Sequence, residues 1–223
     1  MSAHCCVYWH SVYERKWAPE HPLPQLLSRA LSKDMPIVAA YEINDNIGNG
    51  SFESPFMLTL LEEPRCPCCS TKLKFADHVA RHRKIEGGIK EWYLIERRSC
   101  PAGCGLFRVL TEFLFPYKHY DADIITGVLN GTVTPEKNGF EDYPCEKTME
   151  RWKAWMALNF IYINAYLKSI GIRLFAMGIA LAYSTANLIE ELKQREPIDW
   201  LRTAIRAVYN TGGSLASRRT PSE

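Results

Sequence analysis

Two short cysteine-containing turns constrain the fold of this chain more than any other feature of its sequence. The first reads Cys66-Pro-Cys-Cys69, and the second reads Cys100-Pro-Ala-Gly-Cys104, about thirty residues later. Each turn, or knuckle, can direct two sulfur atoms at one point, and two such turns supply the four soft ligands of a closed tetrahedral zinc site. We therefore expect one structural Zn²⁺ on four ligands: Cys66, Cys69, Cys100 and Cys104.

Two other interpretations of the cysteines stay open. The thiols are also compatible with buried reduced cysteines or a redox pair. A rival metal site would use His78 and His82, which are four residues apart and would share one face of a helix, but it leaves the second knuckle unused. Cys68 is expected to be a bystander between ligands, and a change of register would make it a ligand instead. Because four thiolates fill the coordination shell, we expect the metal to support folding and to do no chemistry.

Composition and charge are those of a globular protein with a basic centre. The 223 residues are 47% apolar and 23% charged. Residues 72–119 hold ten Lys and Arg against five Asp and Glu, whereas residues 1–71 hold five against eight. Positive charge around the cysteines is typical of a phosphate-contacting surface, and a solvated basic hairpin would have the same composition.

The sequence predicts no export signal and no membrane span. The first twenty residues contain no apolar run of signal-peptide length, so we expect a cytoplasmic, nucleoid-associated protein. Met35 and Met57 leave a later start of translation open. Lys168 and Arg173 interrupt the apolar C-terminal region, which favours buried helices over a span of about twenty residues.

The pattern of hydrophobic residues and turns predicts an α+β fold, with a small antiparallel zinc ribbon followed by an all-α region that contains a helix-turn-helix-like unit. The expected parts are an N-terminal segment of unclear fold at 1–60, the ribbon at 61–120, the helical domain at 121–210 and a flexible tail at 211–223. Strands are expected at 73–75, 91–97 and 105–110, with a turn at 86–89, and the N-terminal segment favours a helix at 26–31 and a strand at 37–43. Helices are expected at 124–129, 147–159, 160–169, 174–192 and 200–209.

The predicted helix at 147–159 has two chemically different faces. The three-and-four spacing gathers an apolar face that would pack on the preceding helix: Met149, Trp152, Trp155 and Met156. Lys147, Glu150 and Arg151 lie opposite, as in a recognition helix that enters a major groove. The connection to the preceding helix is longer than the usual three or four residues, and an ordinary amphipathic core helix has the same pattern.

Five stretches of the chain carry a resemblance to a known family: Cys66–Ser70, Arg97–Cys100, Phe113–Tyr120, Asp142–Thr148 and Arg151–Trp155. They resemble, over roughly residues 60–160, an uncharacterised bacterial family that joins a zinc ribbon to a helix-turn-helix and is similar to the DNA-binding front ends of insertion-sequence transposases. The resemblance implies zinc at the four cysteines and nucleic-acid contact by the helix at 148–159. Ser70 stands where the family pattern has glycine, and the second knuckle is longer than in that pattern.

Together these features predict a zinc-containing DNA-binding protein, associated with a mobile element or with transcriptional regulation. The ribbon is expected to contact phosphates and the helix to read bases. The expected DNA contacts are Arg81, Arg83, Lys84, Arg97, Arg98 and Lys118 on the ribbon, and Lys147, Thr148, Glu150 and Arg151 on the helix.

Two other functions, a protein-binding adaptor and a DNA-processing enzyme, are compared with the sequence pattern below. An adaptor would use the apolar C-terminal helices for self-association or for a recombinase or transposase partner. A transposase or nuclease would need several carboxylates around divalent metal ions. The C-terminal carboxylates favour a solvated helix surface, so we expect no enzymatic activity: Glu190, Glu191, Glu196 and Asp199.

Overall fold

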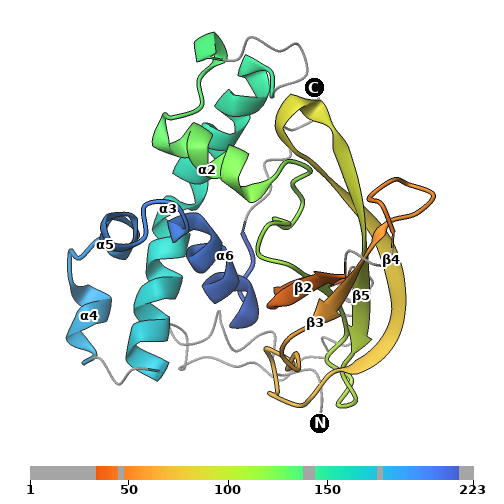
Figure 1. The fold of residues 1–223 in the computed structure, drawn as a ribbon. Helices are drawn as coiled ribbons and strands as arrows, with labels where there is room; N and C mark the ends of the chain where they lie inside the picture. The colour runs from red at the N-terminus through yellow and green to blue at the C-terminus, as the bar shows by residue number, and fades with distance from the viewer. Residues whose placement is uncertain (1–33, 45–47, 138–143, 175–177, 216–223) are drawn as a thin grey trace, which may run out of the picture.

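A computed structural model of the chain describes residues 34–44, 48–137, 144–174 and 178–215, and it shows a curled six-stranded sheet with helices packed beside it (Figure 1). The predicted α+β class is confirmed at this level. The strands pair in the order β1-β6-β5-β3-β2, and β4 pairs with the other edge of β5. Their bounds are β1 Met35–Val38, β2 Tyr41–Asn44, β3 Phe56–Leu60, β4 Lys74–Lys84, β5 Lys90–Ser99 and β6 Leu106–Leu110.

The predicted hairpin is confirmed and is longer than expected. β4 and β5 are antiparallel over their whole length, and Asp77 lies opposite Arg97 after a bulge that begins at Phe75. A 3₁₀ turn at Glu86–Gly88 joins the strands, and Gly87 and Gly88 have positive φ angles of 76° and 73°, which glycine adopts without steric cost. β6 adds to the end of β5 and completes the strands expected around the cysteines.

Residues 35–60 supply three more strands of the same sheet. β1 pairs in parallel with β6, and β3 pairs in parallel with β5 and antiparallel with β2. The prediction of one strand at 37–43 is wrong, because β1 ends at Val38 and β2 begins at Tyr41, and the two strands pair with different neighbours, β6 and β3. The predicted helix at 26–31 lies outside the described residues.

The helices are α2 Ala122–Asn130, α3 Glu146–Leu174, α4 Ala180–Tyr183, α5 Leu188–Arg195 and α6 Trp200–Asn210, with a further 3₁₀ turn at Pro135–Lys137. α2 confirms the helix expected at 124–129. The Asp121 carboxylate accepts a hydrogen bond from the backbone N–H of Asp123 and caps the helix, and Gly131 ends it with a φ of 76°.

Two predicted helix boundaries are wrong. The stretches at 147–159 and 160–169 form one helix, α3, since nothing in the sequence between them breaks the backbone hydrogen bonds. The stretch at 174–192 does not form one helix. Its described part contains α4 and α5, because the Asn187 side chain accepts hydrogen bonds from the N–H groups of Ile189 and Glu190 and starts a new helix. The last predicted helix is confirmed by α6.

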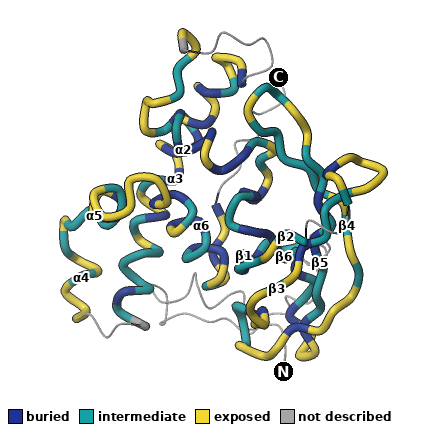
Figure 2. Tube along the Cα trace, in the orientation of Figure 1, coloured by how far each residue is buried: buried dark blue, intermediate teal, exposed yellow. Residues whose placement is uncertain are grey.

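A shared hydrophobic core joins the sheet to the helices, and buried residues occur in both parts (Figure 2). One core cluster contains Val38 from β1 and Phe115, together with apolar residues of α2, α3 and α6. At the C-terminal end of α6, the Asn210 side chain accepts from the Val38 N–H at 2.8 Å and donates to the Val38 carbonyl at 2.6 Å. This pair of bonds fixes α6 to the edge strand β1.

Candidate metal centre and basic residues

The first knuckle is a tight turn that precedes β4. The Ser70 N–H donates to the Cys66 carbonyl at 2.8 Å, and the Cys66 N–H donates to the Thr71 carbonyl at 2.9 Å. Ser70 has a φ of +60°, a left-handed conformation that glycine adopts more easily than serine does. The position where the resembled family pattern has glycine is therefore a position whose backbone favours glycine.

The second knuckle joins β5 to β6. The Gly103 N–H donates to the Cys100 carbonyl at 3.0 Å, and the Cys100 N–H donates to the Gly105 carbonyl at 3.0 Å. Gly103 and Gly105 have φ angles of 79° and 135°, which explains why glycines flank Cys104. The longer spacing of this knuckle does not displace its sulfurs from the site.

The two knuckles bring four sulfur atoms together. The Sγ atoms of Cys66, Cys69, Cys100 and Cys104 all lie within 4.8 Å of one another. Zn–S bonds of about 2.3 Å in a tetrahedron separate sulfurs by about 3.8 Å, so this donor set fits a metal ion of that kind. Cys69 Sγ and Cys100 Sγ are 3.5 Å apart, far beyond the length of a disulfide bond of about 2.05 Å. These four cysteines could hold one metal ion.

The alternatives to this ligand set find less support in the geometry. Cys68 is half-buried beside the apolar cluster that contains Leu73, Phe107 and Val109, and it is not one of the four converging cysteines. His78 and His82 lie on strand β4, so the helical face that the rival site requires is absent from this part of the chain. The helical histidine-pair interpretation is therefore wrong.

The surroundings shift the pKa values of Cys66, Cys69 and Cys104 in different directions. Burial raises the pKa of Cys66 to about 11 and also raises the pKa of Cys104. Cys69 Sγ lies 3.3 Å from Thr71 Oγ1, and hydrogen bonding with this hydroxyl lowers the pKa of Cys69 to about 6. A metal binds thiolates, so it must displace protons from the buried thiols, and its affinity falls as the pH is lowered.

The cluster lies where three strands begin or end. Cys66, Cys100 and Cys104 are buried in a core that also contains Leu73, Phe107 and Val109. The first knuckle leads into β4, and the second connects the end of β5 to the start of β6. An ion at this point would tie the ends of these three strands together.

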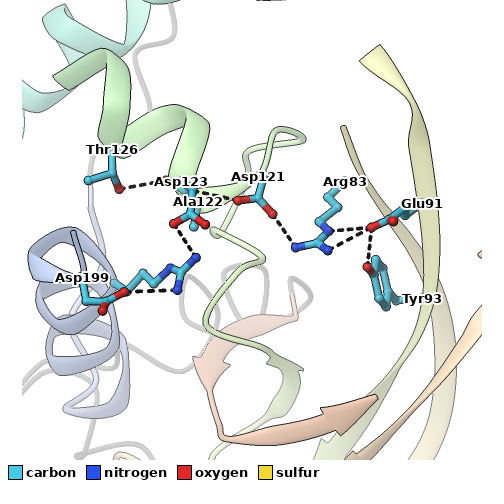
Figure 3. Close-up of polar contacts among 9 residues, drawn as sticks. Arg83, Glu91, Tyr93, Asp121, Ala122, Asp123, Thr126 and Asp199 are labelled. Atoms are coloured by element: carbon cyan, nitrogen blue, oxygen red, sulfur yellow. Dashed lines mark hydrogen bonds and ion pairs between the residues drawn. The ribbon is translucent and has the colours of Figure 1, made fainter. Parts of the chain in front are cut away.

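Arg81 and Arg83 face inward from β4 and bind groups of the protein itself. Arg81 donates to the carbonyls of Phe115 and Lys118 at 2.6 and 2.8 Å, and burial lowers its pKa to about 10. Arg83 pairs with Glu91 of β5 and with Asp121, the cap of α2 (Figure 3). These two arginines connect the hairpin to the chain that follows it.

Arg97 and Arg98, at the other end of β5, also have carboxylate partners. Arg97 pairs with Asp77 of β4 and with Asp34, which lies 3.4 Å from its guanidinium. Arg98 pairs with Glu96 and donates to the Leu73 carbonyl. Contact of Arg81, Arg83, Arg97 and Arg98 with DNA stays a prediction, and it would compete with these intramolecular bonds.

Lys84 and Lys118 lie over aromatic rings. Lys84 Nζ is 5.1 Å from the ring centre of Tyr120, and Lys118 Nζ is 4.4 Å from the ring centre of Trp155. Burial lowers the pKa of Lys118. Cation–π contacts of this kind orient a lysine on the surface without neutralising its charge.

The two predicted faces of the helix are confirmed in the first half of α3. Its apolar side is buried against Ile124 and Val128 of α2, and the buried residues are Met149, Trp152, Trp155 and Met156. Lys147, Glu150 and Arg151 are exposed, and Thr148 is half-buried. These three charged side chains form what we call the polar face of α3.

A family comparison covers the region that contains these features. Residues 66–152 match a family model described as a domain of unknown function (DUF6431). The match begins at Cys66 and ends on α3, within the span of roughly 60–160 over which a family resemblance is predicted. The description states no activity. Comparison with curated proteins and with solved structures gives no match. No helix in the described part of the chain is both long and apolar enough to span a membrane.

Sequence reasoning did not identify the intramolecular partners of the basic residues. In β4 the odd-numbered positions face the interior, as Val79 opposite Ile95 indicates, and Arg81 and Arg83 share that parity. His82 and Lys84 have the opposite parity and face outward. The alternation of side chains along a strand was the signal that could have separated these two groups.

Proposed function

We propose that this chain is a zinc-containing DNA-binding protein, in which one Zn²⁺ on the four cysteines stabilises the fold and the polar face of α3 contacts DNA. Four thiolates leave no open coordination position, so the zinc would bind no substrate. Its role would be to hold the ends of β4, β5 and β6 together. From the resemblance to transposase front ends, we place the protein with a mobile element or with a transcriptional regulator.

The polar face of α3 is the observation that carries the proposal. Within the described residues, no ion pair involves Lys147 or Arg151, in contrast to the arginines of the ribbon. The opposite side of the same helix is fixed by two buried tryptophans, and Tyr120 packs edge-on against Trp152 with ring centres 5.1 Å apart. A helix that is packed on one side and carries on the other two cations outside any ion pair of the described residues suits the major groove of DNA, where arginine can bond guanine.

α2 and α3 supply the two helices of the proposed helix-turn-helix-like unit. α2 packs on the apolar side of α3 and leaves the polar face exposed, and such a unit requires one helix to support the other while the second contacts DNA. The connection between them is longer than in the usual motif, so the proposal concerns the role of α3 and not the exact geometry of the turn.

We propose binding without catalysis. The C-terminal carboxylates that a nuclease interpretation would use have neighbours on the surface of the helices: Glu190 bonds Lys193, Glu191 pairs with Arg195, and Asp199 bonds Arg202. Such pairs three or four residues apart are common on solvated helices. Cleavage or strand transfer of DNA in the presence of Mg²⁺ or Mn²⁺ would contradict this part of the proposal.

The test is binding of the zinc-loaded protein to a pool of random duplex DNA at low salt. Bound sequences are selected and sequenced, and zinc is measured on the same preparation. The proposal expects one zinc per chain and an affinity that falls steeply as salt is raised. Absence of affinity for any duplex at about 50 mM salt would contradict DNA binding.

A second function, self-association or binding of a protein partner, is favoured by one observation. The polar face of α3 continues along the helix into an exposed apolar stripe of Leu158, Ile161 and Tyr162, whose exposed fractions are 45%, 77% and 58%. A cluster of large apolar side chains on a surface often marks an interface. Light scattering of the wild type and of Ile161→Glu, alone and mixed with a recombinase, tests this function. A dimer that the substitution dissociates supports it. A wild type that stays monomeric and does not bind the recombinase contradicts it.

A further inference from the structure

The outer face of the β4–β5 hairpin carries several aromatic rings. On this face His82 lies opposite Trp92, and Ala80 lies opposite Leu94. Phe75 and His78 lie near the start of β4 and are both exposed. β4 is an edge strand of the sheet, and half-buried and exposed residues alternate along its middle, from Asp77 to Arg81 (Figure 2).

The rings contact one another in two groups. In the first, Phe52 packs on Trp92 at 4.8 Å, Trp92 on His82 at 4.7 Å, and His82 stacks on His119 at 4.7 Å with an angle of 12° between the ring planes. In the second, the rings of Phe75 and His78 are 4.9 Å apart. His78 and His82 are four residues apart on one strand, so the two groups are separated by about 13 Å.

The ends of both groups are open to solvent. Phe52 is 67% exposed and Phe75 is 52% exposed, and His119 is exposed at the far end of the first group. Large aromatic side chains are normally buried in the core of a protein, where their removal from water is favourable. Exposed rings gathered on one face form a candidate contact surface for a partner.

The charges beside the rings favour an anionic partner. Lys84 lies opposite Lys90 in the register, two residues from His82 and Trp92 respectively, and so on the same face. Burial lowers the pKa of His82, and the nearby charges of His119 and Lys90 lower it further. Glu96, the carboxylate on this side of β5, is bonded to Arg98.

We propose that the outer face of the β4–β5 hairpin binds single-stranded DNA, with unpaired bases stacked on the exposed rings and phosphates beside Lys84 and Lys90. Rings on an open sheet surface with adjacent cations are the combination that single-strand-binding proteins use, since any base can stack and the backbone needs only positive charge. Duplex DNA keeps its base faces inside the helix and would leave the rings uncovered. The separation of the two ring groups suits a strand that stacks one base on each group with an extended backbone between them.

The choice of DNA over RNA rests on the proposed function, whereas the stacking surface itself does not. The surface is separate from the polar face of α3, so the two can be tested independently. A protein with both would hold duplex DNA beside an unpaired strand.

The experiment measures fluorescence anisotropy of labelled oligonucleotides with the full-length, zinc-loaded protein at low salt. The probes are an oligo-dT single strand, the oligo-U strand of the same length and a random duplex. Phe52→Ser and Phe75→Ser remove the exposed rings, and Ile198→Ser is the matched control, since Ile198 is 70% exposed and lies between α5 and α6. Lys147→Ala with Arg151→Ala tests the α3 surface in parallel.

The proposal expects Phe52→Ser and Phe75→Ser each to weaken oligo-dT binding about tenfold, with Ile198→Ser binding oligo-dT like the wild type. Circular dichroism checks that each variant is folded. Absence of oligo-dT binding, equal binding by the ring variants and the control, or tighter binding of oligo-U would overturn it. Loss of duplex binding in the α3 variant alone reports on the proposed function and leaves this inference standing.

Discussion

Replacing Arg83 by methionine removes the cation that joins the hairpin to the helical part of the chain. Arg83 bonds Glu91 through two of its nitrogens, at 3.0 and 2.9 Å, and also pairs with Asp121. Its side chain is 18% exposed, and those of Glu91 and Asp121 are 25% and 11% exposed. Methionine keeps most of the apolar contact of the side chain but leaves two partly buried carboxylates without their partner.

Loss of one partner from a buried ion pair typically costs 3–5 kcal/mol, and the residual exposure of this group places the expected loss near the lower end, at about 3 kcal/mol of unfolding free energy. Urea unfolding of the zinc-loaded protein measures it. With a slope of about 3 kcal/mol per M, the midpoint should fall by about 1 M while the slope is unchanged.

The matched control is Arg195→Met. Arg195 is 77% exposed and lies 3.9 Å from Glu191, so its substitution should change the unfolding free energy by less than about 0.5 kcal/mol. If Arg83→Met lowers the midpoint no more than Arg195→Met does, the network around Asp121 does not hold the hairpin to α2, and the reasoning is refuted.

Three further predictions follow from the knuckles and the stacked histidines. Cys100→Ser should lose the bound zinc and unfold cooperatively at much lower urea, whereas Cys68→Ser should retain one zinc per chain by metal analysis; equal zinc content in both would contradict the ligand set. Ser70→Gly should raise the unfolding free energy by about 0.5 kcal/mol, because it relieves a φ of +60°, and a loss of stability would show that the serine side chain is needed there. The pKa values of His82 and His119 are lowered below 6.5, mainly by burial, so the unfolded chain binds more protons and stability should fall as the pH drops below about 6.5. The double variant His82→Gln, His119→Gln should show a shallower fall of the urea midpoint with pH than the wild type. Parallel curves for the two proteins would contradict this prediction.

The parts of the fold that the sequence predicted are those set by neighbouring residues. The knuckles, the hairpin with its Gly87-Gly88 turn, and α2 between Asp121 and Gly131 all depend on signals within a few positions. The strands of residues 35–60 could not be predicted in the same way. β1 pairs in parallel with β6 about seventy residues away, and such a pairing is decided by tertiary packing and leaves no local signal.

The candidate site could likewise be predicted only in part from the sequence. Spacing alone located the four cysteines, because metal geometry restricts which residues can converge. Net charge located a basic region but did not reveal that Arg97 pairs with Asp77 and Asp34, one of which is 63 residues away along the chain. Charge counts do not record which side of a strand a residue faces, so they overestimated the number of cations available to a partner.

The most direct test of DNA binding by α3 compares the salt dependence of duplex affinity between the wild type and a variant with Lys147→Ala and Arg151→Ala. Both residues are exposed, so the variant should fold and retain its zinc. The plot of log affinity against log salt should become shallower by roughly two units, about 0.9 for each lost phosphate contact, and the affinity at low salt should fall. An unchanged slope and affinity in a folded, zinc-loaded variant would contradict the account.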